Sequence, residues 1–143
     1  MTIAKIIGDR SADDIIACDV STPVAEVVSM LAGKRIGAVP VLRDGAVAGI
    51  VSERDVIYRL ADKGSACLDL PVEAIMTSPA IMVEPGTKID EALALMTRRR
   101  FRHFPVVSDG RLVAFISIGD LVKHKIDEVE HEAAALRDYI QTA

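Results

Sequence analysis

The 143-residue chain has little of what nucleic-acid-binding proteins depend on. It contains no Trp, only 3% aromatic residues and a formal net charge of −4. A chain without a basic excess lacks the cations that neutralise a phosphate backbone. One with so few aromatic rings also lacks the platforms on which unpaired bases stack. The composition therefore argues against nucleic acid as a partner.

Disulfide and membrane signals are also scarce. The two cysteines, Cys18 and Cys67, stand far apart and form no Cys-x-x-Cys pair. This usage fits a reducing compartment, and we expect both thiols to be buried as small apolar side chains. No apolar run approaches the length of a membrane span, and residues 1–10 carry no secretory pattern. We therefore expect a soluble, cytoplasmic protein without a membrane partner.

Catalytic and metal-binding motifs are missing as well. The chain has no G-x-S-x-G, G-x-G-x-x-G or G-x-x-x-x-G-K-[S/T] sequence and only three histidines. His124, Glu128 and His131 recur at helical spacing, but without H-E-x-x-H or a further ligand this pattern is typical of a solvated face. We expect neither an enzyme nor a metal site.

What the chain does contain is an internal repeat with a constant offset of 65 residues. Ser52-Glu-Arg-Asp55 matches Ser117-Ile-Gly-Asp120, and the same offset relates Thr22 to Thr87, Glu26 to Glu91, Arg35 to Arg100, Pro40-Val41 to Pro105-Val106 and Asp44-Gly45 to Asp109-Gly110. A register held without gaps over this length indicates two copies of one structural unit.

Each copy shows the same succession of structural signals. An amphipathic helix is predicted with a threonine at its N-cap, Thr22 followed by Pro23 in the first copy and Thr87 in the second. Short apolar runs then flank an Asp-Gly hairpin signal, at 38–42 and 47–51 and again at 104–107 and 112–116. A second helix is expected from Ser52 and Ser117, and a short strand before each first helix, at 15–17 and 80–83.

The predicted fold class is α+β, with tandem βαββα repeats packed as a pseudo-twofold pair around one joint core. We expect an N-terminal packing helix in 1–10 built on Ile3, Ile6 and Ile7, repeats at 11–66 and 67–125, and an extended C-terminal helix whose tail is 126–143. Apolar residues in the last helix alternate by four and three: Val122, Ile126, Val129, Ala133, Leu136 and Ile140. This spacing is typical of a coiled-coil seam, and equally of a helix folded back on the repeats.

The Ser-x-x-Asp motif at the start of each second helix has a structural and a functional interpretation. It is a capping-box pattern, in which the Ser and Asp side chains satisfy free backbone N–H groups. The same helix end also attracts anions, and the carboxylate can accept the hydroxyls of a ribose. Because the motif is duplicated beside an expected cleft, we favour a ligand role in addition to the capping role.

Both copies resemble CBS domains, and the whole chain resembles a stand-alone CBS pair (Bateman module). The resemblance rests on Gly49-Ile-Val-Ser-Glu-Arg-Asp55 and Ala114-Phe-Ile-Ser-Ile-Gly-Asp120, reinforced by residues 34–41 and 100–106. It covers residues 11–125, and the paired motifs make it specific. One departure is Ala114, where the pattern usually has Gly, and we expect it to crowd the second cleft slightly.

The resemblance implies two clefts for adenosine-containing ligands. Asp55 and Asp120 would hold the ribose hydroxyls, with Ser52 and Ser117 at the phosphate ends. The remaining contacts would come from Ile15, Ile36, Gly37 and Ala38 in the cleft of Ser117, and from Ala80, Ile81, Phe101, Arg102 and His103 in the cleft of Ser52. Arg100, Arg102 and His103 would face the phosphates while Arg98 and Arg99 stay solvated, so we expect unequal sites.

The resemblance and the motifs together predict a non-catalytic regulatory module for sensing adenine nucleotides, with AMP first and ADP, ATP or NAD(H) as alternatives. S-adenosylmethionine is not excluded, and no cofactor is required. We expect a homodimer, joined in part by the C-terminal helix, and an unidentified regulated partner. Two other hypotheses stay open: a structural dimerisation module with empty clefts, and a nucleotide-hydrolysing enzyme that uses the phosphate clamp.

Overall fold

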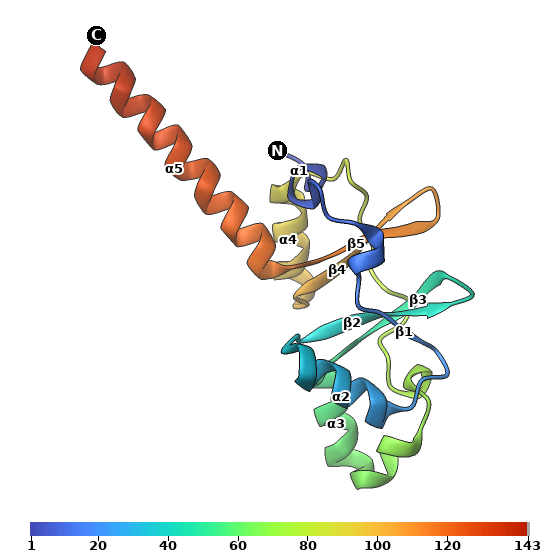
Figure 1. Ribbon diagram of the computed structural model, residues 1–143. Coiled ribbons are helices and arrows are strands. Elements are labelled where there is room, and N and C mark those ends of the chain that lie inside the picture. The colour runs from blue at the N-terminus through green and yellow to red at the C-terminus, as the bar shows by residue number, and fades with distance from the viewer. Residues whose placement is uncertain (143) are drawn as a thin grey trace.

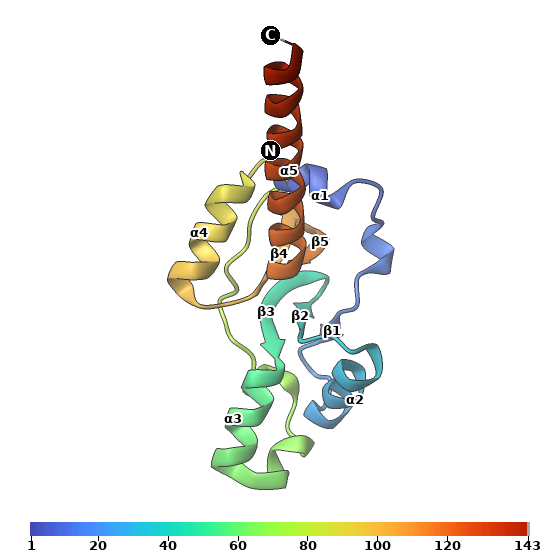
Figure 2. The ribbon, with the colours of Figure 1, turned by 90° about the vertical axis from the view of Figure 1, so that its left-hand side faces the viewer.

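The computed structural model describes residues 1–142 and shows two similar halves, with a long helix that leaves the body of the molecule (Figures 1 and 2). The first half contains β1 (Cys18–Asp19), α2 (Val24–Lys34), β2 (Ala38–Arg43), β3 (Ala46–Ser52) and α3 (Glu53–Lys63). The second contains α4 (Ile89–Arg99), β4 (His103–Ser108), β5 (Arg111–Ser117) and α5 (Ile118–Thr142). The remaining elements are α1 (Ile3–Ile7) and the 3₁₀ helices η1 (Ala12–Asp14), η2 (Gly64–Asp69) and η3 (Val72–Ala74). The predicted α+β class is confirmed.

The two hairpins form where the Asp-Gly pairs predicted them. Asp44 and Gly45 have φ of 52° and 82°, and Asp109 and Gly110 have φ of 52° and 76°. Two consecutive residues of positive φ give the turn whose twist suits a tight hairpin. β2 pairs antiparallel with β3 and β4 with β5, and both pairings shift register at the same place, after Val41 and after Val106. The repeat therefore extends to this irregularity.

The first helix of each copy begins later than predicted. α2 begins at Val24 with Pro23 in the cap position, and α4 begins at Ile89 with Lys88 there; neither has a side-chain cap. The threonines are not the N-caps. Thr22 Oγ1 accepts a hydrogen bond from the Asp19 N–H (3.1 Å), and Thr87 Oγ1 accepts one from the Glu84 N–H (3.2 Å). Each threonine closes the turn that leads into its helix, because its hydroxyl reaches backward along the chain.

The strand predicted at 15–17 was misplaced, and the strand predicted at 80–83 is reduced to pairing at Val83. β1 consists of Cys18 and Asp19, parallel to β2, and in the second half only an isolated bridge between Val83 and Val106 is found within residues 1–142. In the first half the Val20 N–H continues the pairing by donating to the Leu42 carbonyl (3.0 Å). Its equivalent, Pro85, has no N–H to donate, so the pairing stops there.

Each half has its own core, so the prediction of one joint core was wrong. Val72 and Ile75 follow α3 in sequence but belong to the core of the first half. Ile3 and Ile6 of α1, as predicted, are buried, and they belong to the core of the second half. At the 65-residue offset, residues 3–7 correspond to residues 68–72. Each half is thus completed by a segment that precedes the other half in sequence, which leaves less apolar surface to share between the halves.

Two further predictions concern the cysteines and the C-terminal helix. Cys18 and Cys67 are both buried, as predicted. The first turns of α5 stay against α4, where Lys125 pairs with Asp90 at 2.9 Å, and the rest of the helix extends away from the body (Figure 1). The apolar stripe of α5 is exposed, which excludes the alternative that the helix folds back. No helix in the described part of the chain has both the length and the apolar content to cross a membrane.

Candidate functional site: two clefts between the halves

Both Ser-x-x-Asp motifs form the predicted capping boxes. Ser52 Oγ accepts from the Asp55 N–H (3.3 Å), and Asp55 Oδ2 accepts from the Ser52 N–H (2.8 Å). Ser117 and Asp120 repeat these bonds at 3.2 and 3.0 Å. The capping bonds to the backbone engage only one oxygen of each carboxylate. The other oxygen, Oδ1, remains available for a further donor.

A cavity of about 460 Å³, here called the Ser52 cleft, opens at the N-terminus of α3. All eight residues predicted for this cleft line it: Ser52, Asp55, Ala80, Ile81, Arg100, Phe101, Arg102 and His103. Sequence reasoning missed several of its neighbours, namely Ala38, Ile50, Glu53, Arg54, Thr77, Pro79 and Arg99. Among these, Thr77 Oγ1 donates to Asp55 Oδ1 (3.2 Å). Arg99, expected only to be solvated, is exposed and also lines the cavity.

A second cavity of about 320 Å³, the Ser117 cleft, opens at the N-terminus of α5. It brings together the predicted Ile15, Ile36, Ala38, Ser117 and Asp120, and adds Arg10, Ser11, Asp14, Ile16, His103, Val113, Ala114 and Phe115. Gly37 was predicted for this cleft but lines the Ser52 cleft instead. Neighbouring residues of an extended segment face opposite sides, so Gly37 and Ile36 face different clefts. A Cβ at position 37 would lie 3.5 Å from His103 and 3.8 Å from Glu53, on the side of the Ser52 cleft.

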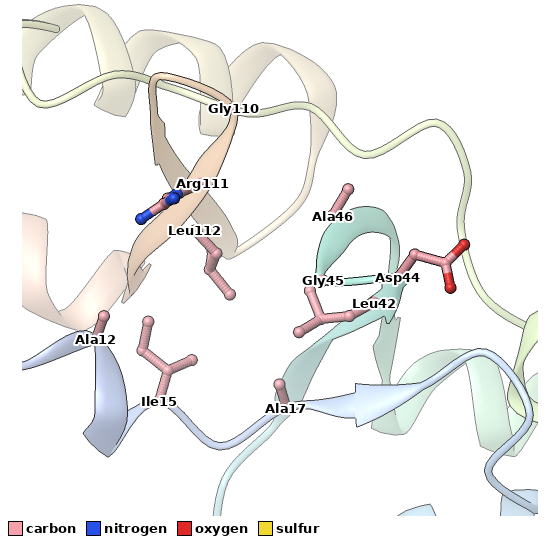
Figure 3. A pocket seen from close by; sticks show the side chains of 10 residues that line it. All are labelled: Ala12, Ile15, Ala17, Leu42, Asp44, Gly45, Ala46, Gly110, Arg111 and Leu112. Atoms are coloured by element: carbon pink, nitrogen blue, oxygen red, sulfur yellow. The ribbon is translucent and has the colours of Figure 1, made fainter.

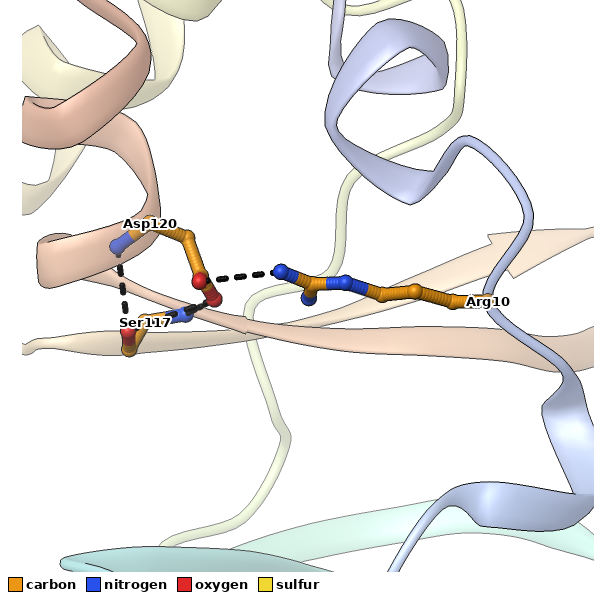
Figure 4. Close-up of polar contacts among 3 residues, drawn as sticks. All are labelled: Arg10, Ser117 and Asp120. Atoms are coloured by element: carbon orange, nitrogen blue, oxygen red, sulfur yellow. Dashed lines mark hydrogen bonds and ion pairs between the residues drawn. The ribbon is translucent and has the colours of Figure 1, made fainter.

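The free oxygens of the two aspartates meet different donors. Asp120 Oδ1 accepts from the guanidinium of Arg10 (3.0 Å), as Figure 4 shows, whereas Asp55 Oδ1 accepts from the Thr77 hydroxyl. Burial raises the pKa of Asp120, but the bonds from Arg10 and Ser117 outweigh it, so the net pKa is lowered. No sequence signal indicated Arg10, because the repeat places Ile75 at the equivalent position.

His103 lines both clefts. Its ring stacks on Phe115 with centroids 5.5 Å apart, which fixes the imidazole between the two cavities. Burial lowers the pKa of His103, and the nearby carboxylates of Asp120 and Glu53 oppose this only in part. The neutral ring is therefore favoured more than in water.

A third cavity, of about 480 Å³, lies between the two hairpin turns and the segment before β1 (Figure 3). Its walls are the turn residues together with Ile15, Leu42 and Leu112, and its charged residues are Asp44 and Arg111. The sequence did not predict it, because it arises where the two hairpins meet. Residues 1–142 contain no cluster of three His, Cys, Asp or Glu side chains arranged to hold a metal ion.

Comparison with known proteins follows the repeat. The family model for the CBS domain matches residues 7–62 and 72–127. CBS domain-containing protein CBSX3, mitochondrial, of Arabidopsis thaliana is 35% identical over 129 residues, which cover 87% of this chain and 63% of that protein. The chain thus spans less than two thirds of that relative.

Solved structures share the fold. The CBS-domain containing protein ATU1752 of Agrobacterium tumefaciens is 33% identical with a TM-score of 0.81, covering 87% of this chain and 99% of its own. CBSX2, solved in complex with AMP, is 24% identical with a TM-score of 0.74, covering 88% of this chain and 96% of its own. At this identity CBSX2 shows the fold alone.

Proposed function

The chain belongs to the CBS-domain family, and from this premise we propose that it is a non-catalytic regulatory module that binds an adenine nucleotide in the clefts between its halves. One observation carries the proposal: each duplicated Ser-x-x-Asp motif caps a helix and also lines a cleft built from both halves. The AMP complex of CBSX2, which shares this fold, supports an adenosine ligand.

The Ser52 cleft offers a place for each part of a nucleotide. Ala80, Ile81 and Phe101 supply apolar walls for the adenine, and Phe101 is held edge-on against Phe104 at 4.8 Å. Asp55 Oδ1 accepts a ribose hydroxyl, in place of or beside Thr77. The phosphates lie toward Ser52 and the N–H groups of α3, facing Arg100, Arg102 and His103. AMP is the first candidate, with ADP, ATP and NAD(H) as alternatives.

The regulatory step follows from the position of the clefts. Because residues of both halves line each cavity, a ligand that fits one arrangement of the halves better than another shifts their equilibrium. The changed surface is then read by a partner protein, which the chain itself does not identify. We further propose a homodimer joined in part by the exposed stripe of α5.

Thermal unfolding in the presence of ligands tests the proposal. The protein is stripped of co-purified nucleotide and heated with AMP, ADP, ATP, NAD, NADH or S-adenosylmethionine. A ligand at 100 times its Kd adds about 2.7 kcal/mol, a shift of several degrees. The doubly substituted Asp55→Ala/Asp120→Ala protein loses this response, whereas Asp62→Ala, which removes an exposed carboxylate of α3, keeps it.

Two outcomes contradict the proposal. If no ligand shifts the midpoint and the purified protein releases no nucleotide, the clefts are empty and the chain is a structural dimerisation module. If the protein turns over ATP in the presence of a metal ion, the module is an enzyme.

A further inference from the structure

The two clefts carry different charge although they are built from the same repeat. The Ser52 cleft is lined by the arginines Arg54, Arg99, Arg100 and Arg102 and by the carboxylates Glu53 and Asp55. The Ser117 cleft is lined by one arginine, Arg10, and by the carboxylates Asp14 and Asp120. With His103 neutral, the first cleft has an excess of positive charge and the second an excess of negative charge.

One glycine accounts for part of this difference. At the 65-residue offset, Gly119 takes the place of Arg54. Gly37 takes the place of Arg102, but it lines the Ser52 cleft and so adds no side chain to the Ser117 cleft. Lys34 and Arg35 correspond to Arg99 and Arg100, but neither is among the residues that line the Ser117 cleft. The second cleft therefore lacks the cations that surround the first.

The one cation in the Ser117 cleft is already paired. The Arg10 guanidinium donates to Asp120 Oδ1 at 3.0 Å (Figure 4), which leaves Asp14 as the uncompensated charge. The other lining side chains are mainly apolar: Ile15, Ile16, Ile36, Val113, Ala114 and Phe115. A helix N-terminus opens onto each cleft, so the helix dipole favours anions in both and does not discriminate between them. The side-chain charges do.

We propose that the two clefts sort adenosine ligands by the charge of the 5′ substituent. The Ser52 cleft binds the adenosine whose 5′ group is a negatively charged phosphate, whether AMP, ADP or ATP, and the Ser117 cleft binds an adenosine whose 5′ group carries no negative charge. This rests on the proposed function, because both clefts are taken to be adenosine sites. The module then reads two ligands at once, and neither ligand displaces the other.

Calorimetric titration of adenosine into the ATP-saturated full chain tests the sorting. The titration shows a single adenosine per chain, bound with an affinity that changes little with salt, and the Asp120→Ala variant loses it. ATP also binds once per chain, and its affinity falls with added salt because the contacts are charged. Arg102→Ala weakens ATP roughly tenfold or more. Arg98→Ala removes a neighbouring exposed arginine that does not line the cleft, and leaves ATP binding unchanged.

A gain of function provides the converse test. Gly119→Arg places a cation where Arg54 stands in the other cleft, and a Cβ at position 119 has Ser117 Oγ as its nearest neighbour, at an ordinary 3.5 Å. This variant binds a second ATP, which now competes with adenosine.

The sorting is overturned if ATP fills both clefts of the unmodified protein with similar affinity, if saturating ATP blocks adenosine, or if Asp120→Ala retains adenosine binding. Each of these results contradicts the sorting but leaves the proposed function, binding of an adenine nucleotide in the clefts, in place. Failure of both ligands to bind contradicts the proposed function itself.

Discussion

At the scale of residues, Gly49 allows the segment that follows η3 to pack closely against β3. The segment after η3 crosses β3 at this point, where Ile50 and Thr77 exchange backbone hydrogen bonds of 3.0 and 2.8 Å. A Cβ at position 49 would lie 2.6 Å from the Thr77 carbonyl oxygen and 2.8 Å from Met76 Sδ. The equivalent residue in the second half is Ala114, which is buried and lines the smaller cleft. Only the first copy requires glycine here.

Gly49→Ala should therefore lower the free energy of unfolding by about 1–3 kcal/mol, the usual cost of forcing atoms into a packed region. Gly33→Ala is the matched control: it lies in α2, no atom comes within 4 Å of its added Cβ, and it should stabilise by roughly 0.5–1 kcal/mol. Urea denaturation of both variants measures the difference. Equal effects would show that the close approach at Gly49 is relieved without cost.

The lowered pKa of His103 predicts the sign of one contribution to the pH dependence of stability. Burial lowers the pKa of this imidazole from its ordinary 6.5, so the unfolded chain takes up the proton before the folded chain does. The neutral imidazole therefore makes its full contribution to the free energy of unfolding above pH 6.5. This contribution is lost as the pH falls through the lowered pKa of the folded state. We expect His103→Gln to flatten the fall in stability from about pH 7 to pH 5. Denaturation curves of both proteins across this pH range measure the effect. If the free energy of unfolding falls with pH as steeply in the variant as in the unmodified protein, His103 is not the cause.

At the scale of elements, residues 1–7 and 68–76 each bind through the backbone to the start of a helix in the half whose core they complete. The Ile3 N–H donates to the Thr87 carbonyl (2.9 Å), which docks α1 at the start of α4. The Val24 N–H donates to the Leu70 carbonyl (2.9 Å), which docks residues 68–76 at the start of α2. Because α1 and η1 also flank Arg10, the docking of α1 positions one wall of the Ser117 cleft.

Removing the anchor of α1 should be costly. Ile3 is fully buried in the second core, so Ile3→Ala should lower the free energy of unfolding by about 2–5 kcal/mol. Lys5→Ala, an exposed change in the same helix, should have little effect. Thermal unfolding compares the two, and similar midpoints would mean that α1 contributes little to the core.

At the scale of the whole molecule, the unpartnered surface is the stripe of α5. Val122, Ile126, Val129, Leu136 and Ile140 are 41–64% exposed, and they recur at the spacing of a coiled-coil seam. Lysines and glutamates flank the stripe, with Lys123 and Lys125 near its start and Glu130 and Glu132 one heptad on. Charges of both signs beside an apolar seam suit a second copy of the same helix.

We expect Ile126→Asp to convert the proposed homodimer to a monomer without a large loss of thermal stability, because the side chain is 52% exposed in the single chain. His131→Gln, on the exposed opposite face of α5, leaves the dimer intact. Sedimentation equilibrium measures both. A wild type that is monomeric at every concentration, or a variant that stays dimeric, would show that α5 does not join the chains.

The sequence by itself determined the repeat, both hairpins, the two capping boxes and the buried N-terminal isoleucines, because these depend on interactions within a few residues or on plain apolar patterning. Only the tertiary structure decided the rest. Arg10 and Asp120 form an ion pair across 110 positions of sequence. Residues 1–7 and 68–76 each complete the opposite half, which gives two cores rather than one. Such long-range contacts depend on how the halves meet in space, and no local pattern of residues records that.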